Sequence, residues 1–319
     1  MTAYVVRRLV LGAVVLALVT IGVFLILHMI PGDAVSLQLQ DASGVSEEQA
    51  EALRESFGLN DPVHVQLAQW AGDAIRGDLG ESFWTGESVT TMFLDRVPVT
   101  LQLGAWSVLI STIVGIALGI VSAVRRGGWV DNAVRVFAVA GLSVPNYVVA
   151  LLLLILLGTQ FAWSPPLVYR GLFEDPVSYV QQLALPVFAL ASGSVAAIAR
   201  MTRSSMLEAL NSNYIRTVRA KGATSWLIYF KHALRNSSIP VFTLVGVHLA
   251  TVLGGTVILE TLFGLPGTGQ LIYDSVLSRD YPVVVACTIF YAGLFVLTVI
   301  LIDLVYAVID PRIRTGKGS

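Results

Sequence analysis

The chain has 319 residues, of which 55% are hydrophobic and only 13% are charged, with a mean hydropathy of +0.75 and a formal net charge of −1. A typical soluble domain carries about 25% charged residues, so this composition excludes a protein whose whole surface faces water. Several apolar runs exceed the roughly 18 residues that indicate a membrane helix, and the sequence therefore predicts an integral membrane protein. The single cysteine, Cys287, lies in an apolar run, where we expect it to be a small buried hydrophobe.

The N-terminal segment, residues 1–30, is predicted to be a membrane-spanning helix. Arg7 and Arg8 precede an unbroken apolar run over residues 9–30, which as a helix would span about 33 Å. A signal peptide would have a shorter apolar region and a small-residue cleavage site. We therefore expect a retained helix with both arginines on the cytoplasmic side.

Residues 31–96 have the composition of an extramembrane lobe. A helix is expected over about 47–57, because Ser46 begins a capping-box spacing. A second helix is expected between Asp61 and Gly77. The lobe is acidic, and we interpret its carboxylates as a solvated face.

Five further apolar runs follow the lobe, at about 97–124, 135–157, 180–201, 241–262 and 282–309. The first contains Gly115 and Gly119 at a spacing that allows close approach of another helix. The second contains Pro145, which should kink the helix and free backbone carbonyls. Such a kink could line a pathway or simply serve packing.

The distribution of cations tests whether the fourth span, which is the least apolar, exists. With six spans and the N-terminus inside, 15 of the 20 Lys and Arg residues lie on the cytoplasmic side. Without the fourth span the basic segment after it would lie outside, against the positive-inside rule. The outside cations are then Arg54, Arg76, Arg96, Arg170 and Arg279.

The basic segment between the fourth and fifth runs, at about 204–239, is the most distinctive polar part of the chain. Its pattern over 214–230 predicts a short helix, a turn at Gly222 and a second short helix. Arg216, Arg219 and Lys221 would then point into the cytosol. From the residues alone, this segment is either a docking surface or a loop whose charges only set the topology.

No catalytic or metal-binding constellation emerges from the sequence, and we expect neither an enzyme nor a cofactor. The four histidines lie far apart, and Gly264–Leu271 has the glycine spacing of a phosphate loop without its Lys and Ser/Thr. The ionisable residues expected within spans are few: His248, Glu260 and Asp303. They are too few for a proton-coupled transporter; His248 is a packing residue or a substrate contact, and Glu260 is expected to reach the interface.

Several stretches together resemble one family along nearly the whole chain. They are Pro31–Asp33, Gly77–Phe83, Gly141–Pro145, Tyr214–Ala223, His232–Pro240, Glu260–Gly267, Asp280–Pro282 and Asp310–Arg314. In these the chain resembles the membrane permeases of binding-protein-dependent ABC importers of the dipeptide/oligopeptide/nickel family, of the first-permease type. The general Glu-Ala-Ala motif of the family's EAA loop is replaced here by Arg216, Thr217 and Val218, whereas Gly222 and Leu234 hold their places.

The resemblance implies an all-α membrane protein with six transmembrane helices of the type I ABC importer permease fold. The implied organisation is an N-terminal helix (1–30), an extracytoplasmic lobe between helices 1 and 2 (31–96), a five-helix core (97–310) containing the EAA loop (about 204–239), and a cytoplasmic tail (311–319). Both termini would be cytoplasmic, and the protein would be a multi-pass component of the cell membrane. The implied ATPase-coupling residues are Arg216, Thr217, Arg219, Ala220, Lys221, Gly222 and Ala223.

The function implied is transport of short peptides by alternating access, with ATP hydrolysed in separate subunits. The implied partners are a second homologous permease, two cytoplasmic ATP-binding subunits, an extracytoplasmic substrate-binding protein and the lipid bilayer, with no nucleic acid. Nickel chelates, haem or another small solute are alternative substrates; a self-sufficient secondary transporter or channel and a membrane-anchored assembly or signalling protein are alternatives of other classes. Candidate residues of the translocation path are Ser143, Asn146 and His248.

Overall fold

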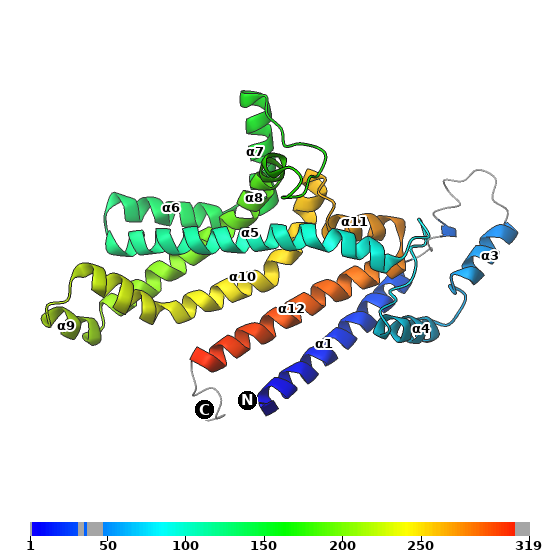
Figure 1. The fold of residues 1–319 in the computed structure, drawn as a ribbon, viewed down its shortest axis with the longest axis horizontal. Coiled ribbons are helices and arrows are strands. Elements are labelled where there is room, and N and C mark those ends of the chain that lie inside the picture. The colour runs from blue at the N-terminus through cyan, green and yellow to red at the C-terminus, as the bar shows by residue number, and fades with distance from the viewer. Residues whose placement is uncertain (1, 31–34, 37–46, 310–319) are drawn as a thin grey trace. The chain divides into compact units, whose positions relative to one another are not determined.

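The computed structural model describes residues 2–30, 35–36 and 47–309, and these residues are almost entirely helical (Figure 1). The only β-bridge among them joins Glu81 and Ser88. The helices are α1 (Thr2–Met29), α3 (Glu47–Ser56), α4 (Val63–Ile75), α5 (Val89–Val124), α6 (Trp129–Ser143), α7 (Asn146–Phe161), α8 (Pro176–Leu210), α9 (Asn213–Ala220), the π-helix η1 (Leu227–Ala233), α10 (Leu234–Phe263), α11 (Thr268–Ser278) and α12 (Tyr281–Ile309). The prediction of an all-α protein is confirmed.

Five of the described helices are long and apolar enough to cross a membrane. A sixth crossing is possible if α6 and α7 form one broken span, since they pass the same criterion together but are bent by 103° at Pro145. The proline therefore breaks this helix rather than only kinking it. The expected number of six spans fits when this bent pair is counted as one.

The helices are longer than the apolar runs that predicted them. Helix α5 begins at Val89, before the run at 97, and keeps Pro98 inside it. Helix α10 and the π-helix before it extend back to Leu227 with Pro240 inside, so the second short helix expected after the turn at Gly222 is instead the beginning of this long helix.

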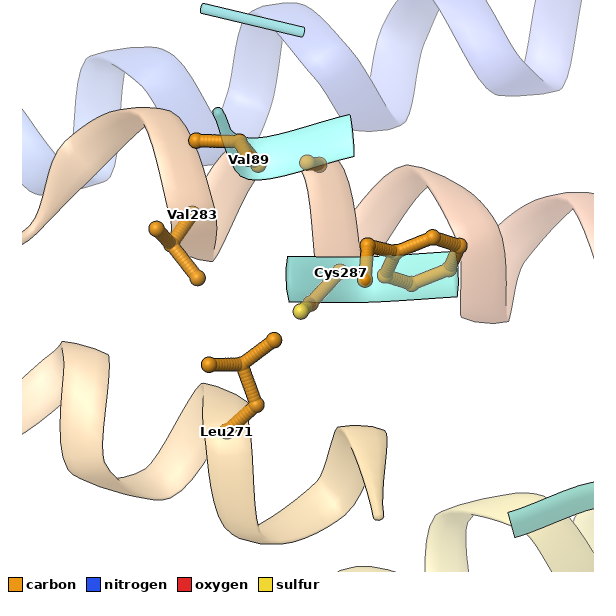
Figure 2. Packing of buried hydrophobic residues seen from close by; sticks show 6 residues of the cluster. Val89, Leu271, Val283 and Cys287 are labelled. Carbon is orange, nitrogen blue, oxygen red and sulfur yellow. The ribbon is translucent and has the colours of Figure 1, made fainter. Parts of the chain in front are cut away.

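The chain divides into two compact units, one formed by the chain up to Thr100 together with the chain from Gly264, and the other by residues 101–263. In the first unit α1 and α12 run side by side, with Val296 against Gly12 (Figure 1). A hydrophobic cluster joins the start of α5 to α11 and α12 and contains Cys287, fully buried as expected (Figure 2).

The predicted lobe helices are confirmed as α3 and α4, while Ser46, the expected cap, lies outside the described residues. Val63, Leu67 and Trp70 of α4 pack against a cluster that includes Phe24 and Tyr281. Further along the chain, the Ser82 hydroxyl and the Phe83 amide donate to the buried carboxylate of Asp280, and Nε1 of Trp84 donates to the carbonyl of Ser278 at 2.7 Å. Polar as well as apolar contacts therefore hold this segment to the turn between α11 and α12.

In the second unit α8 is the central helix and packs against α6, α7 and α10. Its apolar stretch is 67% buried, against 33% for that of α5, and small residues such as Ala189, Ala196 and Ala199 have no exposed surface. A helix surrounded by protein needs small residues for close packing more than it needs lipid-compatible side chains. This explains why the fourth run is the least apolar of the six.

The pair Gly115 and Gly119 lies where α5 meets α8, as their spacing predicted. A Cβ at Gly115 would lie 2.7 Å from Cβ of Ile198, and one at Gly119 would lie 2.7 Å from the carbonyl oxygen of Ala199. Neither position has room for a side chain. The absence of side chains is what lets the two helices approach this closely.

Candidate functional site

The basic segment is built around the short helix α9, which is capped at both ends. The Ser212 hydroxyl accepts from the amide of Ile215 at its beginning. At its end Gly222 has φ +81°, its amide donates to the carbonyl of Arg219, and the amide of Ala223 donates to that of Val218. This is a Schellman motif, which requires a left-handed residue and therefore favours glycine at 222.

The structure presents most of the expected coupling residues together on one surface. Ile215 is buried, with 1% of its surface exposed, and anchors α9 from beneath. The exposed residues are Arg216, Thr217, Arg219, Ala220, Lys221 and Gly222, while Ala223 is half-buried. The exposed set carries three cations and no carboxylate, so an acidic partner surface would suit it. We call residues 216–223 the α9 surface.

A polar contact joins α9 to the π-helix η1. The Tyr214 hydroxyl lies 2.7 Å from Nδ1 of His232, with the two rings in a T-shaped arrangement. From η1, Ile228 and Ala233 are buried. Trp226 and Phe230 pair at 3.8 Å between ring centroids and remain exposed. Helix α9 is thus attached to the helix that continues into α10, a link that no sequence pattern indicated.

A buried ion pair joins α6 to α8, the helix that precedes α9. Both carboxylate oxygens of Asp131 accept from Arg203, from Nε at 2.6 Å and from Nη2 at 2.9 Å. The Ser122 hydroxyl and the Gly127 amide donate to the same carboxylate, which is 1% exposed. Four hydrogen bonds compensate for burying this charge, as a buried ion pair requires. The pair ties the turn between α5 and α6 to the segment that leads into α9.

A cavity of about 210 Å³ opens at the break between α6 and α7. Two of the three candidate path residues, Asn146 and His248, line it, whereas Ser143 does not and instead donates to the carbonyl of Val139. The remaining lining consists of Val144, Leu190, Gly193, Ser194, Thr251, Val252 and Gly255. Helices α7, α8 and α10 therefore bring together polar groups that are far apart in the sequence.

His248 is held in the cavity by Ser194. Its Nδ1 lies 2.8 Å from the Ser194 hydroxyl, while its Nε2 is buried and has no hydrogen-bond partner among the described residues. In the sequence Ser194 stands out only as a polar interruption of an apolar run, which does not predict this role. Glu260, in contrast, was wrongly expected to reach the interface: it is fully buried, because it lies with Thr256 and Leu259 on the buried face of the C-terminal part of α10.

The glycine-rich segment from Gly264 to Leu271 uses its amides internally. The amide of Thr268 donates to Oγ1 of Thr100 at 2.9 Å, and the amide of Gly267 donates to the carbonyl of Leu265 at 2.7 Å. A phosphate loop needs such amides to point at the phosphate. These contacts give the segment a structural role at the start of α11.

Comparisons with known proteins bear directly on this arrangement. The family described as "Binding-protein-dependent transport system inner membrane component" matches residues 115–315, and its N-terminal counterpart matches residues 1–104. A probable peptide ABC transporter permease protein, y4tP, of Sinorhizobium fredii is 38% identical over 98% of this chain and 100% of its own length. The oligopeptide transport system permease protein AppB of Bacillus subtilis is 36% identical over 98% of this chain and 100% of its own length.

A solved structure supports the fold. A chain of the MetNI methionine ABC transporter, solved in inward-facing conformations, matches with a TM-score of 0.56 and 21% identity. The match covers 69% of this chain and 96% of that chain. The chain described here thus has the fold of a type I ABC transporter permease.

Proposed function

This chain belongs to the family of binding-protein-dependent transport system inner membrane components, and from that membership we propose that it forms one half of the path by which an ABC importer moves short peptides across the cell membrane. The peptide substrate is supported by full-length relatives in two organisms that carry peptide and oligopeptide permease names. The other half of the path is a second homologous permease. An extracytoplasmic binding protein delivers the peptide, and two cytoplasmic ATP-binding subunits supply the energy.

The proposed orientation places both termini and the α9 surface in the cytoplasm. It follows from the excess of Lys and Arg on one side of the six spans, which is the strongest determinant of orientation in the sequence. Residues 47–88, which precede α5, then lie on the outer side. The acidic lobe faces the binding protein in this arrangement.

The single observation that carries the mechanism is the physical connection between the α9 surface and the cavity. Tyr214 ties α9 to His232 on η1, and η1 continues without a break into α10. Helix α10 carries His248, which lines the cavity. A rigid-body displacement of α9 by a moving partner is therefore transmitted along one helix to the cavity.

In this mechanism the α9 surface contacts an ATP-binding subunit through Arg216, Thr217, Arg219, Ala220, Lys221, Gly222 and Ala223. Closure of the two ATP-binding subunits moves α9 and turns the cavity outward to receive the peptide; reopening returns it inward. Asn146 and His248 contact the peptide. Ser143, which lies just before the break, enters the path only when the α6–α7 break changes its geometry.

The decisive experiment replaces Gly222 with Asp in the complete importer. A side chain at φ +81° strains the Schellman motif, and a carboxylate at this position reduces the positive charge that the α9 surface presents to its partner. We expect the variant to insert into the membrane normally but to lose copurification of the ATP-binding subunits and at least about ten-fold of coupled uptake, since one or more interface contacts of about 1–2 kcal/mol are lost. Copurification from detergent extracts and uptake in proteoliposomes measure the two effects.

Gly77→Asp is the matched control for backbone strain. Gly77 has φ +90° and, like Gly222, has no atom within 4 Å of the point where a Cβ would lie, but it belongs to the lobe. We expect this variant to retain the ATP-binding subunits. Equal retention by both variants would contradict the docking role of the α9 surface.

A further inference from the structure

The cavity at the α6–α7 break is polar but carries no carboxylate, ammonium or guanidinium group among its lining residues. Its polar side chains are Asn146, Ser194, His248 and Thr251, and apolar walls are supplied by Val144, Leu190 and Val252. Such a lining has no fixed counter-charge for an ionised side chain or terminus of a peptide. It is suited to a neutral polar group.

The buried Nε2 of His248 is a hydrogen-bonding group, in a residue that lines the cavity, that the described residues leave unused. Nδ1 is satisfied by Ser194 at 2.8 Å, but Nε2 has no hydrogen-bond partner among the described residues although its atom is buried. Native proteins rarely leave a buried polar atom unsatisfied, and exceptions mark functional groups or bound water. His248 stands near the middle of α10, facing the cavity.

The Ser194–His248 pair can present either a donor or an acceptor to a ligand. If the Ser194 hydroxyl donates to Nδ1, then Nε2 carries a hydrogen and donates; if it accepts from Nδ1, then Nε2 accepts. The side-chain amide of Asn146 likewise carries both functions. A peptide group also carries one donor and one acceptor, and is neutral.

We infer that this cavity binds a main-chain amide group of the transported peptide, with His248 and Asn146 as its hydrogen-bonding partners. The inference rests on the proposed function and adds to it the part of the substrate that the permease reads. Every peptide has the same main chain, so such a site would discriminate peptides from other small solutes without discriminating among side chains.

Gly255 keeps the cavity open beside Asn146. A Cβ at this position would lie 3.0 Å from Cδ1 of Leu190 and 3.3 Å from Nδ2 of Asn146. Its neighbour in the sequence, Gly254, has no atom within 4 Å of the same position. The two glycines therefore provide a matched pair: an added methyl group intrudes on the cavity at 255 and meets open space at 254.

The first experiment measures uptake of trialanine and of the analogue in which one peptide bond is replaced by an ester, each bond in turn. The ester removes the amide N–H and makes the carbonyl oxygen a weaker acceptor, while it keeps the shape, so the replacement weakens a hydrogen bond to His248 in either direction. Proteoliposomes would hold the complete importer with wild-type chain or with His248→Ala, at the same concentration of binding protein. The binding protein's own preference is common to both, so it cancels in the ratio between the two importers.

For one of the two ester analogues, we expect the amide-to-ester uptake ratio of the wild-type importer to be about five-fold larger than that of the His248→Ala importer. A factor of this size corresponds to the loss of one ordinary hydrogen bond. An amide-to-ester ratio that is the same in both importers for both bonds would overturn the inference. If the wild-type importer transports trialanine, that result leaves the proposed function standing; if it transports no peptide with ATP, both fail.

The second experiment keeps the inference testable if His248→Ala does not fold. We expect Gly255→Ala to reduce trialanine uptake several-fold and to reduce the amide-to-ester ratio, because the methyl group displaces Asn146. Gly254→Ala should retain both. Equal behaviour of the two variants, in complexes with the same yield, would overturn the assignment of the cavity as the peptide site.

Discussion

At the residue scale, the hydrogen bonds that a buried polar side chain makes indicate whether its role is structural or functional. The carboxylate of Asp131 accepts four hydrogen bonds, two of them from Arg203, and therefore has its acceptor capacity filled. His248 has one ring nitrogen satisfied and the other buried without a partner among the described residues. A filled group stabilises the fold, whereas a group with spare capacity beside a cavity is available to a ligand.

Asp280 is a buried carboxyl group whose ionisation destabilises the folded state. Burial raises the pKa of Asp280 above its ordinary value of 3.8, although hydrogen bonds from Ser82 and from the amide of Phe83 act in the opposite direction. Because the folded pKa exceeds the unfolded one, the folded state binds this proton more tightly. The resulting stability is present below the unfolded pKa and is lost as the pH rises through the folded pKa.

We therefore predict that the apparent melting temperature of the purified chain falls as the pH is raised from about 4 through the folded pKa of Asp280. Asp280→Asn should flatten this part of the profile, since an amide cannot ionise. Glu87→Gln, at an exposed position of the lobe, should leave the profile unchanged. The melting temperatures are measured by thermal unfolding in detergent. Parallel pH profiles for wild type and Asp280→Asn would show that this carboxyl group does not cause the pH dependence of stability.

At the element scale, the close approach of α5 to α8 depends on glycine. We predict that Gly119→Ala destabilises the chain by about 1–3 kcal/mol, the usual cost of overpacking a close contact. The added Cβ would lie 2.7 Å from the carbonyl oxygen of Ala199, and backbone yields less readily than a side chain. Unfolding in mixed micelles of increasing sodium dodecyl sulfate content would measure the change.

Gly158→Ala serves as the control for that substitution. Gly158 lies inside helix α7 with no atom within 4 Å of its Cβ position, so alanine should be neutral or slightly stabilising there through its higher helix propensity. A loss of stability at Gly119 no greater than at Gly158 would mean that α8 can move away from α5 without cost.

At the scale of the whole molecule, the orientation in the membrane is the property on which the proposed mechanism depends. We predict that a cysteine at Thr85 reacts with a membrane-impermeant maleimide added to intact cells and that a cysteine at Thr224 does not. Both residues are exposed, and the native Cys287 is fully buried, so the background labelling should be low. Ser46 should behave as Thr85 does, although it lies outside the described residues.

The control for this labelling is permeabilisation of the cells, after which the cysteine at Thr224 should react as well. Labelling of Thr224 in intact cells together with protection of Thr85 would reverse the topology. It would place the α9 surface away from cytoplasmic ATP and remove the proposed coupling.

The membrane-spanning segments of this protein, the two lobe helices and one close helix contact could be predicted from the sequence alone, whereas helix α11 and the π-helix η1 could not. Each membrane-spanning segment must itself be apolar, because its own side chains contact the hydrocarbon core of the bilayer. Apolar runs therefore mark the spans without knowledge of the fold. The spacing of Gly115 and Gly119 likewise predicted a close helix contact, because two residues four apart lie on one helix face. The turn at Gly222 was predictable since a left-handed residue favours glycine.

Only the tertiary structure decided what the polar groups do. Asn146, Ser194 and His248 stand on three helices, and no pattern along the chain shows that they line one cavity while Ser143 does not. The same holds for the Asp131–Arg203 pair, for the contact of Tyr214 with His232 and for the burial of Glu260. Each depends on packing between segments distant in sequence, whereas periodicity records only the average surroundings of a single helix.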